Sequence, residues 1–257
     1  MIDLYNLPLP VIFVCGLALI WGASEVGWRL ADRREGQSPN IGTLESATLG
    51  LLALLVGFTF AMALARFEAR RDAVVQEANA IGTTALRARF LPEPNRAESL
   101  KLLREYVKVR IEAFQSGHSL VERKATVERS NAVQEALWQQ ANAVAEKDKA
   151  LIPTGLFIQA LNQMFDAQGV RLAALRNQIP SIVLVTLYVL AAAASGFVGY
   201  ATAIDPRLTR LPVFVMGLLI SLVLYLIIDI DRPNSGFITN NQQAMLDVAE
   251  SIKSFPD

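Results

Sequence analysis

Four long apolar segments are the feature of this sequence that most constrains its fold. The hydrocarbon core of a bilayer is about 30 Å thick, and a helix needs roughly 20 apolar residues to cross it. Four stretches meet this requirement, at about residues 7–27, 47–65, 179–203 and 211–228, and charged residues follow each of them. The sequence therefore predicts an all-α integral membrane protein with four transmembrane helices.

The stretch between the second and third spans differs in character because it is polar. Apolar residues recur there at spacings of three and four, as at Leu100, Leu103 and Val107, which is typical of amphipathic helices. We therefore expect an inserted, all-helical extramembrane domain. The expected division of the chain is transmembrane helices at 1–65, the helical domain at 66–178, two further transmembrane helices at 179–228 and a carboxy-terminal segment at 229–257.

Composition argues against several classes of function. The formal net charge is +0, whereas a nucleic-acid-binding protein needs a basic surplus. His118, in a polar turn, is the only histidine, and Cys15 is the only cysteine. The chain also carries no glycine-rich phosphate loop, CxxC pair or HExxH signature. The sequence therefore predicts no nucleic-acid partner, no metal site, no cofactor and no catalytic centre.

The predicted spans are almost free of charge. Glu25 is the only charged residue inside them, and it lies near the end of the first span. Proton-coupled carriers and pumps usually need charged or histidine side chains at mid-depth to relay protons or bind ions. Passive conduction or a purely structural role fits this pattern better.

Small residues recur at a spacing of four in the third span. Ala192 and Gly196 form one such pair, and Ser195 and Gly199 form another. Small residues at this spacing allow two helix backbones to approach closely. We expect these residues, together with Gly57 of the second span, at helix–helix contacts.

The second span carries a different pattern, a stripe with a repeat of four residues. Gly50, Leu54, Phe58 and Met62 form the stripe, and Leu55, one residue along, is expected to face lipid. Such a stripe can face lipid, pack against other helices, or line a hydrophobic constriction that gates by dewetting. The periodicity alone leaves these three interpretations open.

Two segments resemble the bestrophin family, and in particular the bacterial proteins called bestrophin-like. In the second span, the pairs Gly57-Phe58 and Arg66-Phe67 are similar to a Gly-aromatic pair and an Arg-aromatic pair of bestrophins. The sequence DIDRPNSGF at 229–237 is similar to the acidic segment after their last span. The order of the elements agrees as well, with two spans, a helical domain, two spans and then this segment.

Three departures from the bestrophin pattern limit what the resemblance carries over. Glu68 stands where bestrophins have a second aromatic residue, and Gly50 stands at the first of three bulky apolar positions of their neck. The acidic calcium-binding run of animal bestrophins is absent after Pro233. Control by calcium is therefore not implied.

The resemblance implies a homo-oligomeric anion channel, since bestrophins are pentamers that conduct inorganic anions. The second span would line the pore, with Leu54 and Phe58 as its neck. Arg66 would lie at the inner end, where it attracts anions or, alternatively, anchors the helix at the membrane interface. The carboxy-terminal motif would cap the last span and link it to the helical domain; its residues are Asp229, Asp231, Arg232, Pro233 and Gly236.

A second interpretation belongs to another class, a non-conducting membrane scaffold or sensor whose helical domain binds a partner. The lack of charge in the spans fits both. Orientation is also open from the residues, because arginines near the span ends are nearly balanced between the two sides. The resemblance implies a bacterial inner membrane, with membrane lipid around the spans and the helical domain in the cytoplasm.

Overall fold

The computed structural model describes residues 5, 7–31, 39–115, 120–147, 151–205, 209–233 and 236–255. The chain divides into two compact units. We call the first, Met1–Phe67 with Asn177–Thr239, the membrane unit, and the second, Glu68–Arg176 with Asn240–Asp257, the helical unit. His118 lies outside the described residues, so its placement in a turn stays a prediction.

The membrane unit holds the apolar helices. The described part of the chain contains 4 helical stretches long and apolar enough to cross a membrane. They lie in α1 (Leu9–Leu30), the first part of α2 (Pro39–Ala88), α6 (Ser181–Ile204) and α7 (Arg210–Asp231). Pro8 and Pro180 directly precede α1 and α6, where the fixed φ of proline suits the start of a helix. The prediction of an all-α membrane protein with four apolar spans is confirmed.

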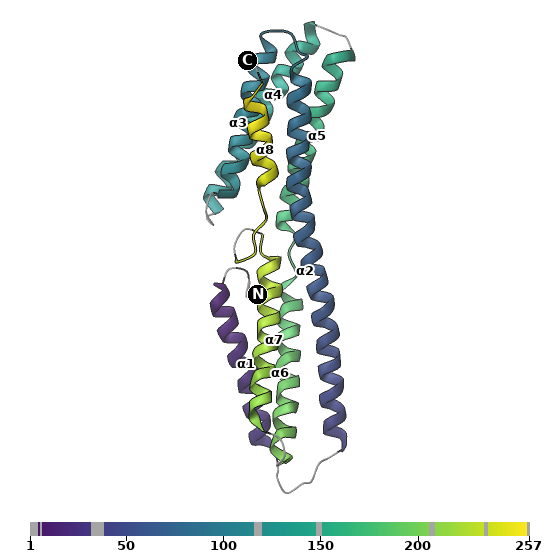
Figure 1. Cartoon of the computed structure of the whole chain (residues 1–257), viewed down its shortest axis with the longest axis vertical. Coiled ribbons are helices and arrows are strands. Elements are labelled where there is room, and N and C mark those ends of the chain that lie inside the picture. The colour runs from purple at the N-terminus through teal and green to yellow at the C-terminus, as the bar shows by residue number, and fades with distance from the viewer. Residues whose placement is uncertain are drawn as a thin grey trace. The chain divides into compact units, whose positions relative to one another are not determined.

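Helices α1, α6 and α7 pack side by side within the membrane unit, and the α1–α6 contact is the most extensive (Figure 1). The apolar core of the unit takes buried residues from all four spans. Among them are Ile20 of α1, Leu52 of α2, Leu187 of α6 and Leu224 of α7. The first part of α2 therefore has one face turned toward the other spans.

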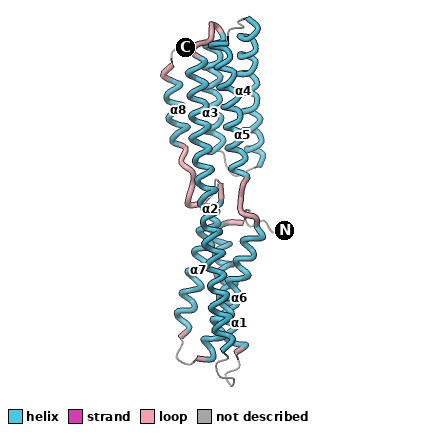
Figure 2. Tube along the Cα trace, turned by 90° about the vertical axis from the view of Figure 1, so that its right-hand side faces the viewer, coloured by secondary structure: helices cyan, strands magenta, loops and turns pink. Residues whose placement is uncertain are grey.

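The helical unit is a bundle built around the second part of α2. Its other members are α3 (Asn95–Gln115), α4 (Leu120–Lys147), the short π-helical turn η2 (Leu151–Gly155), α5 (Leu156–Arg176) and α8 (Gln243–Lys253). Figure 2 shows α3, α4, α5 and α8 as neighbouring helices of this bundle. Each long helix contributes to one apolar core, for example through Ile81, Leu103, Leu137, Leu161 and Met245. Helix α8 comes from the end of the chain and packs on α3.

Candidate functional site

One face of α2 is exposed along the apolar part of the helix. Leu54 and Phe58 are 54% and 65% exposed, and Gly50 is exposed as well. On the opposite face, Leu52 and Ala63 are buried in the apolar core of the membrane unit. An apolar spanning helix with one packed and one open face is available to lipid, to another copy of the chain, or to a pore.

The predicted stripe does not keep to this open face for its whole length. A spacing of four residues drifts by about 40° per step, because a helix has about 3.6 residues per turn. Met62 is therefore half-buried and packs against the core, while Ala61 remains exposed. Leu55 is also half-buried against the core, so the expectation that it faces lipid is wrong.

Arg66 lies at the end of the part of α2 that belongs to the membrane unit. Its side chain is 18% exposed, and its Nη1 atom lies 3.8 Å from Oδ1 of Asp231, whose side chain is fully buried. An ion pair with so little access to water holds the guanidinium close to the end of α7. The charge of Arg66 is therefore largely offset within the chain.

Asp231 also holds the chain segments that precede two of the spans. Its Oδ2 atom accepts a hydrogen bond from the backbone N–H of Ile179, at 2.7 Å, and a short one from the Tyr5 hydroxyl. The same hydroxyl lies 3.1 Å from the Ile179 carbonyl oxygen. Burial raises the pKa of Tyr5, and the bond to Asp231 raises it further, so the phenol stays protonated and can donate.

Asp229 holds the loop that follows α7. Its two carboxylate oxygens accept hydrogen bonds from the backbone N–H groups of Phe237, at 2.9 Å, and Ile238, at 3.1 Å. Gly236 makes this approach possible, because it adopts a φ of +141° and a Cβ at this position would overlap Oδ1 of Asp229. The motif therefore needs both the acid and the glycine.

Arg232 completes this arrangement, which we call the polar clasp and define as Asp229, Asp231 and Arg232. The Nη2 atom of Arg232 donates to the carbonyl oxygen of Leu7, at 2.6 Å, just before α1. Pro233 follows directly, where the helix has ended. All these partners belong to the membrane unit. The clasp therefore holds three segments at the end of α7, namely the segment before α1, the segment before α6 and the loop after α7.

The small residues of α6 lie against α1. A Cβ on Gly199 would overlap the carbonyl oxygen of Ser24, and a Cβ on Gly27 would overlap that of Gly196. Gly196 itself is less restricted, because its nearest neighbour, the carbonyl oxygen of Ala23, would lie 3.6 Å from an added Cβ. The close approach of the two backbones therefore depends on Gly199 and Gly27.

The other small residues behave differently from one another. Ser195 is buried and Ala192 is half-buried on α6. A Cβ on Gly57 would meet no atom within 4 Å, and this glycine lies on the open face of α2. Among the residues that the structure describes, Gly57 therefore meets no neighbouring helix, and its role in helix packing stays a prediction.

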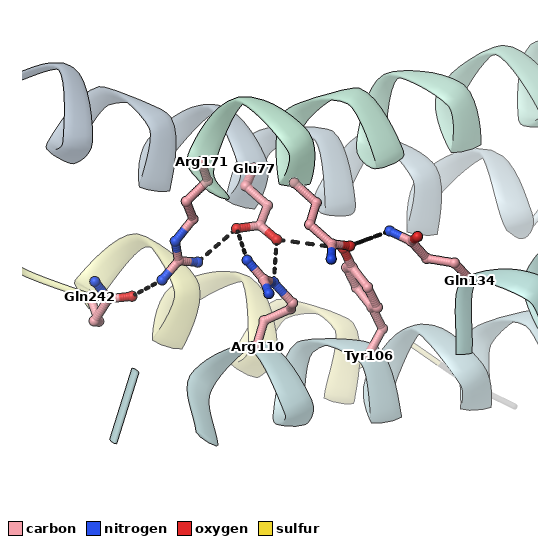
Figure 3. A network of polar contacts seen from close by, with 7 residues as sticks. Glu77, Tyr106, Arg110, Gln134, Arg171 and Gln242 are labelled. Carbon is pink, nitrogen blue, oxygen red and sulfur yellow. Dashed lines mark hydrogen bonds and ion pairs between the residues drawn. The ribbon is translucent and has the colours of Figure 1, made fainter. Parts of the chain in front are cut away.

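A buried ionic network in the helical unit escaped the sequence analysis. Glu77 of α2 is fully buried and accepts hydrogen bonds from two arginines (Figure 3). Arg110 donates to it through Nε, at 2.5 Å, and through Nη2, at 3.2 Å. Arg171 donates to it through Nη1, at 2.7 Å, and reaches Gln242 with its Nη2 atom, at 2.8 Å. The network thus joins α2, α3, α5 and the segment before α8.

Neutral side chains extend this network. The Tyr106 hydroxyl lies 2.8 Å from Oε1 of Gln168, and it accepts a hydrogen bond from Nε2 of Gln134, at 3.2 Å (Figure 3). A signal for the network existed in the sequence, because Glu77 and Arg110 fall on the apolar helical repeats of α2 and α3. The pattern alone could not pair them, since 33 residues separate the two side chains.

Metal-binding chemistry finds no support in the part of the chain that the structure describes. No group of three or more His, Cys, Asp or Glu side chains lies close enough together there to hold an ion. The carboxylates of the polar clasp instead accept hydrogen bonds from backbone and tyrosine donors. These acids therefore act as structural acceptors.

The comparisons with known proteins identify a family and a shared fold. A family model described as the Bestrophin-like domain matches residues 12–245. No match was found among the curated proteins. Two crystal structures of a bacterial bestrophin homologue from Klebsiella pneumoniae share the fold. The first is a mutant of that homologue, which matches this chain with a TM-score of 0.66 at 14% identity. The match covers 94% of this chain and 96% of the homologue. A structure phased with zinc has a TM-score of 0.65 at 13% identity, covering 96% of both chains. Since the family model spans most of the sequence, the chain belongs to the bestrophin-like family.

Proposed function

We propose that this bestrophin-like protein is an ion channel formed by several copies of the chain, with the open face of α2 lining the pore. One observation carries the proposal: Leu54 and Phe58 are more than half exposed on a spanning helix whose opposite face is packed against its own chain. Several such helices around an axis would turn these side chains toward one another. Membership of the bestrophin-like family supports the same arrangement, and a pentamer is the copy number that the resemblance implies.

The narrowest part of this pore would be an apolar ring of Leu54 and Phe58. Such a ring resists wetting, and an ion that sheds water there without polar partners faces a barrier of several kcal/mol. The small residues Gly57 and Ala61 share the open face and leave more room. Constriction and gating are therefore assigned to Leu54 and Phe58.

The experiment is to record currents from purified protein in planar bilayers and to count its subunits by electron microscopy. We expect a ring of copies and a measurable current. The double change Leu54→Ala and Phe58→Ala should raise the current several-fold, because a wider ring is wetted more easily. Leu219→Ala on α7 is the matched control, since Leu219 is 55% exposed but lies on another span.

Two results would overturn the proposal. A monomer, or protein that is silent in both wild-type and variant form, would favour a non-conducting scaffold whose helical unit binds a partner. An effect of Leu219→Ala as large as that of the double change would assign the pore to another helix.

The location that goes with this function is the bacterial inner membrane, with the helical unit in the cytoplasm. Glu105, on α3, is exposed and suits a labelling test. In a chain with Cys15 replaced by serine, a cysteine introduced by Glu105→Cys should resist a membrane-impermeant thiol reagent in intact cells and react after lysis. Ready labelling before lysis would place the helical unit outside.

A further inference from the structure

We propose that a groove between α1 and α6 binds one acyl chain of an anionic phospholipid, whose phosphate group Arg29 holds. The groove has a volume of about 590 Å³ and lies entirely within the membrane unit. The proposal goes beyond the function proposed above, and it stands whether or not the chain conducts ions.

Small apolar side chains make this groove. Ala18 and Gly22 line it from α1, and Ala193 lines it from α6. Every lining side chain is apolar except that of Tyr200, which carries a hydroxyl group. A Cβ added to Gly22 would meet no atom within 4 Å, so this glycine opens onto free space. An unfilled gap of this kind forfeits dispersion contacts, so an apolar occupant is favoured in a bilayer.

The dimensions of the groove fit an acyl chain. Its lining residues on α1 run from Ala18 to Leu30, a stretch about 18 Å long at a rise of about 1.5 Å per residue. One leaflet contributes about 15 Å of hydrocarbon, half of the bilayer core, so the groove extends over about one leaflet. Its length therefore matches the acyl chain of a lipid in that leaflet.

The width of the groove excludes a helix from a second copy. Its volume divided by its length gives a mean cross-section of about 33 Å². A helix with its side chains is about 10 Å or more across, so its cross-section is about 80 Å². A single hydrocarbon chain is narrow enough, because its carbon atoms pack at about 4 Å from their neighbours.

The charges at the Leu30 end of α1 suit a phosphate group. Arg29 follows Val26 by three residues and Gly22 by seven, which places it on the groove side of the helix. Its side chain is 72% exposed, and among the described residues it pairs only through Nε, with Glu25 at 2.8 Å. Both Nη groups are therefore free for a phosphate, which arginine binds through paired hydrogen bonds.

A second arginine keeps this end of the groove positive. Nη1 of Arg210 lies 3.3 Å from the other carboxylate oxygen of Glu25. Two guanidinium groups thus share one carboxylate, which leaves one positive charge in excess. This excess favours a lipid with a net negative headgroup over one whose headgroup is neutral overall.

Native mass spectrometry of the purified full-length protein tests the wild type first. The protein is titrated with dioleoyl phosphatidylglycerol and, in parallel, with dioleoyl phosphatidylcholine, which has the same acyl chains but a headgroup with no net charge. We expect one tight site per chain for phosphatidylglycerol, with a dissociation constant about tenfold lower than for phosphatidylcholine, because the choline cation is repelled by the excess positive charge.

Filling the groove should remove the site. Gly22→Leu places a bulky side chain in the space for the acyl chain, and it should weaken phosphatidylglycerol binding about tenfold or more. Gly42→Leu is the matched control, because Gly42 is an exposed glycine of α2 whose added Cβ would also meet nothing within 4 Å. Thermal unfolding and subunit number, measured on both variants, show whether each is folded and assembled as the wild type is.

Removing the charge should abolish the preference and leave the groove intact. Arg29→Gln should bring the two lipids to about equal affinity, since glutamine cannot replace the charge-assisted bonds to the phosphate. Glu25 keeps its pair with Arg210, so no carboxylate is left alone. Arg129→Gln is the control, because it removes an exposed arginine that also pairs with an acid but lies in the helical unit.

Each failure has its own meaning. Equal affinity of the wild type for the two lipids, or a preference that Arg29→Gln leaves unchanged, would overturn the assignment to an anionic lipid. Phosphatidylglycerol binding that survives Gly22→Leu in folded protein, or that Gly42→Leu weakens equally, would overturn the assignment to the groove. A changed subunit number in Gly22→Leu, with no lipid bound to the wild type, would assign the groove to a second copy.

Two further results keep the test decisive. If Gly22→Leu does not fold, the comparison of the two lipids and Arg29→Gln still decide the proposal, because neither alters the packing of α1 on α6. A protein that binds phosphatidylglycerol as expected but is silent in planar bilayers would overturn the proposed channel and support the lipid site.

Discussion

The two units of this protein bury their charged side chains in different places. In the membrane unit, the buried charged residues Asp229, Asp231 and Arg232 gather at one end of α7, where the spans stop. In the helical unit, Glu77, Arg110 and Arg171 meet in the interior of the bundle. The same chain therefore uses polar contacts where the spans stop in one unit and between packed helices in the other.

This difference reflects the two solvents. Within lipid there is little hydrophobic driving force between helices, so association depends on close packing of small residues such as Gly27 and Gly199. The helical unit, which the sequence predicts to lie outside the membrane, would gain there from burying its apolar core away from water. That gain can support a buried ionic network, which in turn specifies how the helices align. Each unit should therefore lose stability when the polar or close-packed contacts that the structure assigns to it are removed.

The largest effect is expected from Glu77→Ala. Removing this carboxylate leaves Arg110 and Arg171 buried without their shared partner, and breaking a buried ion pair in this way costs about 3–5 kcal/mol. The free energy of unfolding of the helical unit, measured by denaturant titration, should fall by this amount. Glu105→Gln, at an exposed position, should change it by less than about 0.5 kcal/mol. A cost below about 1 kcal/mol for Glu77→Ala would show that the arginines find water or other partners.

A smaller loss is expected in the membrane unit from Gly199→Ala. The added methyl group would overlap the carbonyl oxygen of Ser24, so α1 and α6 must move apart, and overpacking of this kind costs about 2–3 kcal/mol. Thermal unfolding in detergent measures the loss. Gly22→Ala is the matched control, because a Cβ there meets nothing within 4 Å. Equal melting temperatures for the two variants would mean that the backbones are not as close as described.

The polar clasp should tolerate substitution better than the α1–α6 contact does. The change Gly236→Ala tests this expectation. Alanine is strained at a φ of +141°, and its Cβ would press on the Asp229 carboxylate, so we expect a loss of about 1–2 kcal/mol. The same thermal unfolding experiment applies. Phe237→Ala, at a side chain that is 80% exposed, should have little effect. If the two variants behave alike, the bonds from Asp229 to the loop contribute nothing measurable.

The spans could be predicted from the sequence because a membrane allows few solutions. A run of about 20 apolar residues in lipid must satisfy its own backbone hydrogen bonds, and a helix does so within the segment. The face of α2 was harder to predict. A repeat of four residues identified Leu54 and Phe58, but it included Met62 because it ignores the helical drift.

The polar contacts could not be predicted for a different reason. The motif at 229–237 was recognised, but nothing in its letters shows that Asp231 reaches Ile179 or that Arg232 reaches Leu7. Such bonds join segments that are distant in the chain, so their partners depend on the assembled fold. Only Gly236 offered a local signal, since a glycine after an acidic helix end often marks a backbone conformation that other residues avoid.

The smallest effect is expected from Tyr106→Phe, which removes the neutral part of the ionic network. Nε2 of Gln134 also lies within hydrogen-bond distance of Oε1 of Gln168, so the two glutamines can still pair when the hydroxyl is lost. The cost in unfolding free energy at neutral pH should therefore be about 0.5–1.5 kcal/mol. Gln134→Ala would leave the Tyr106–Gln168 bond in place and should cost no more.

The pH dependence of this variant separates the hydroxyl from simple packing. Burial raises the pKa of Tyr106 above its ordinary value of 10.0, and the nearby charge of Glu77 raises it further. The folded state thus holds the proton more tightly than the unfolded state. The contribution to stability is complete below about pH 10 and is lost as the pH rises from there toward the higher pKa of the folded state. Unfolding free energies measured at increasing alkaline pH should fall more steeply for the wild type than for Tyr106→Phe, so that the gap between them narrows. Parallel curves would mean that the Tyr106 hydroxyl titrates as it does in water and is not held inside the network.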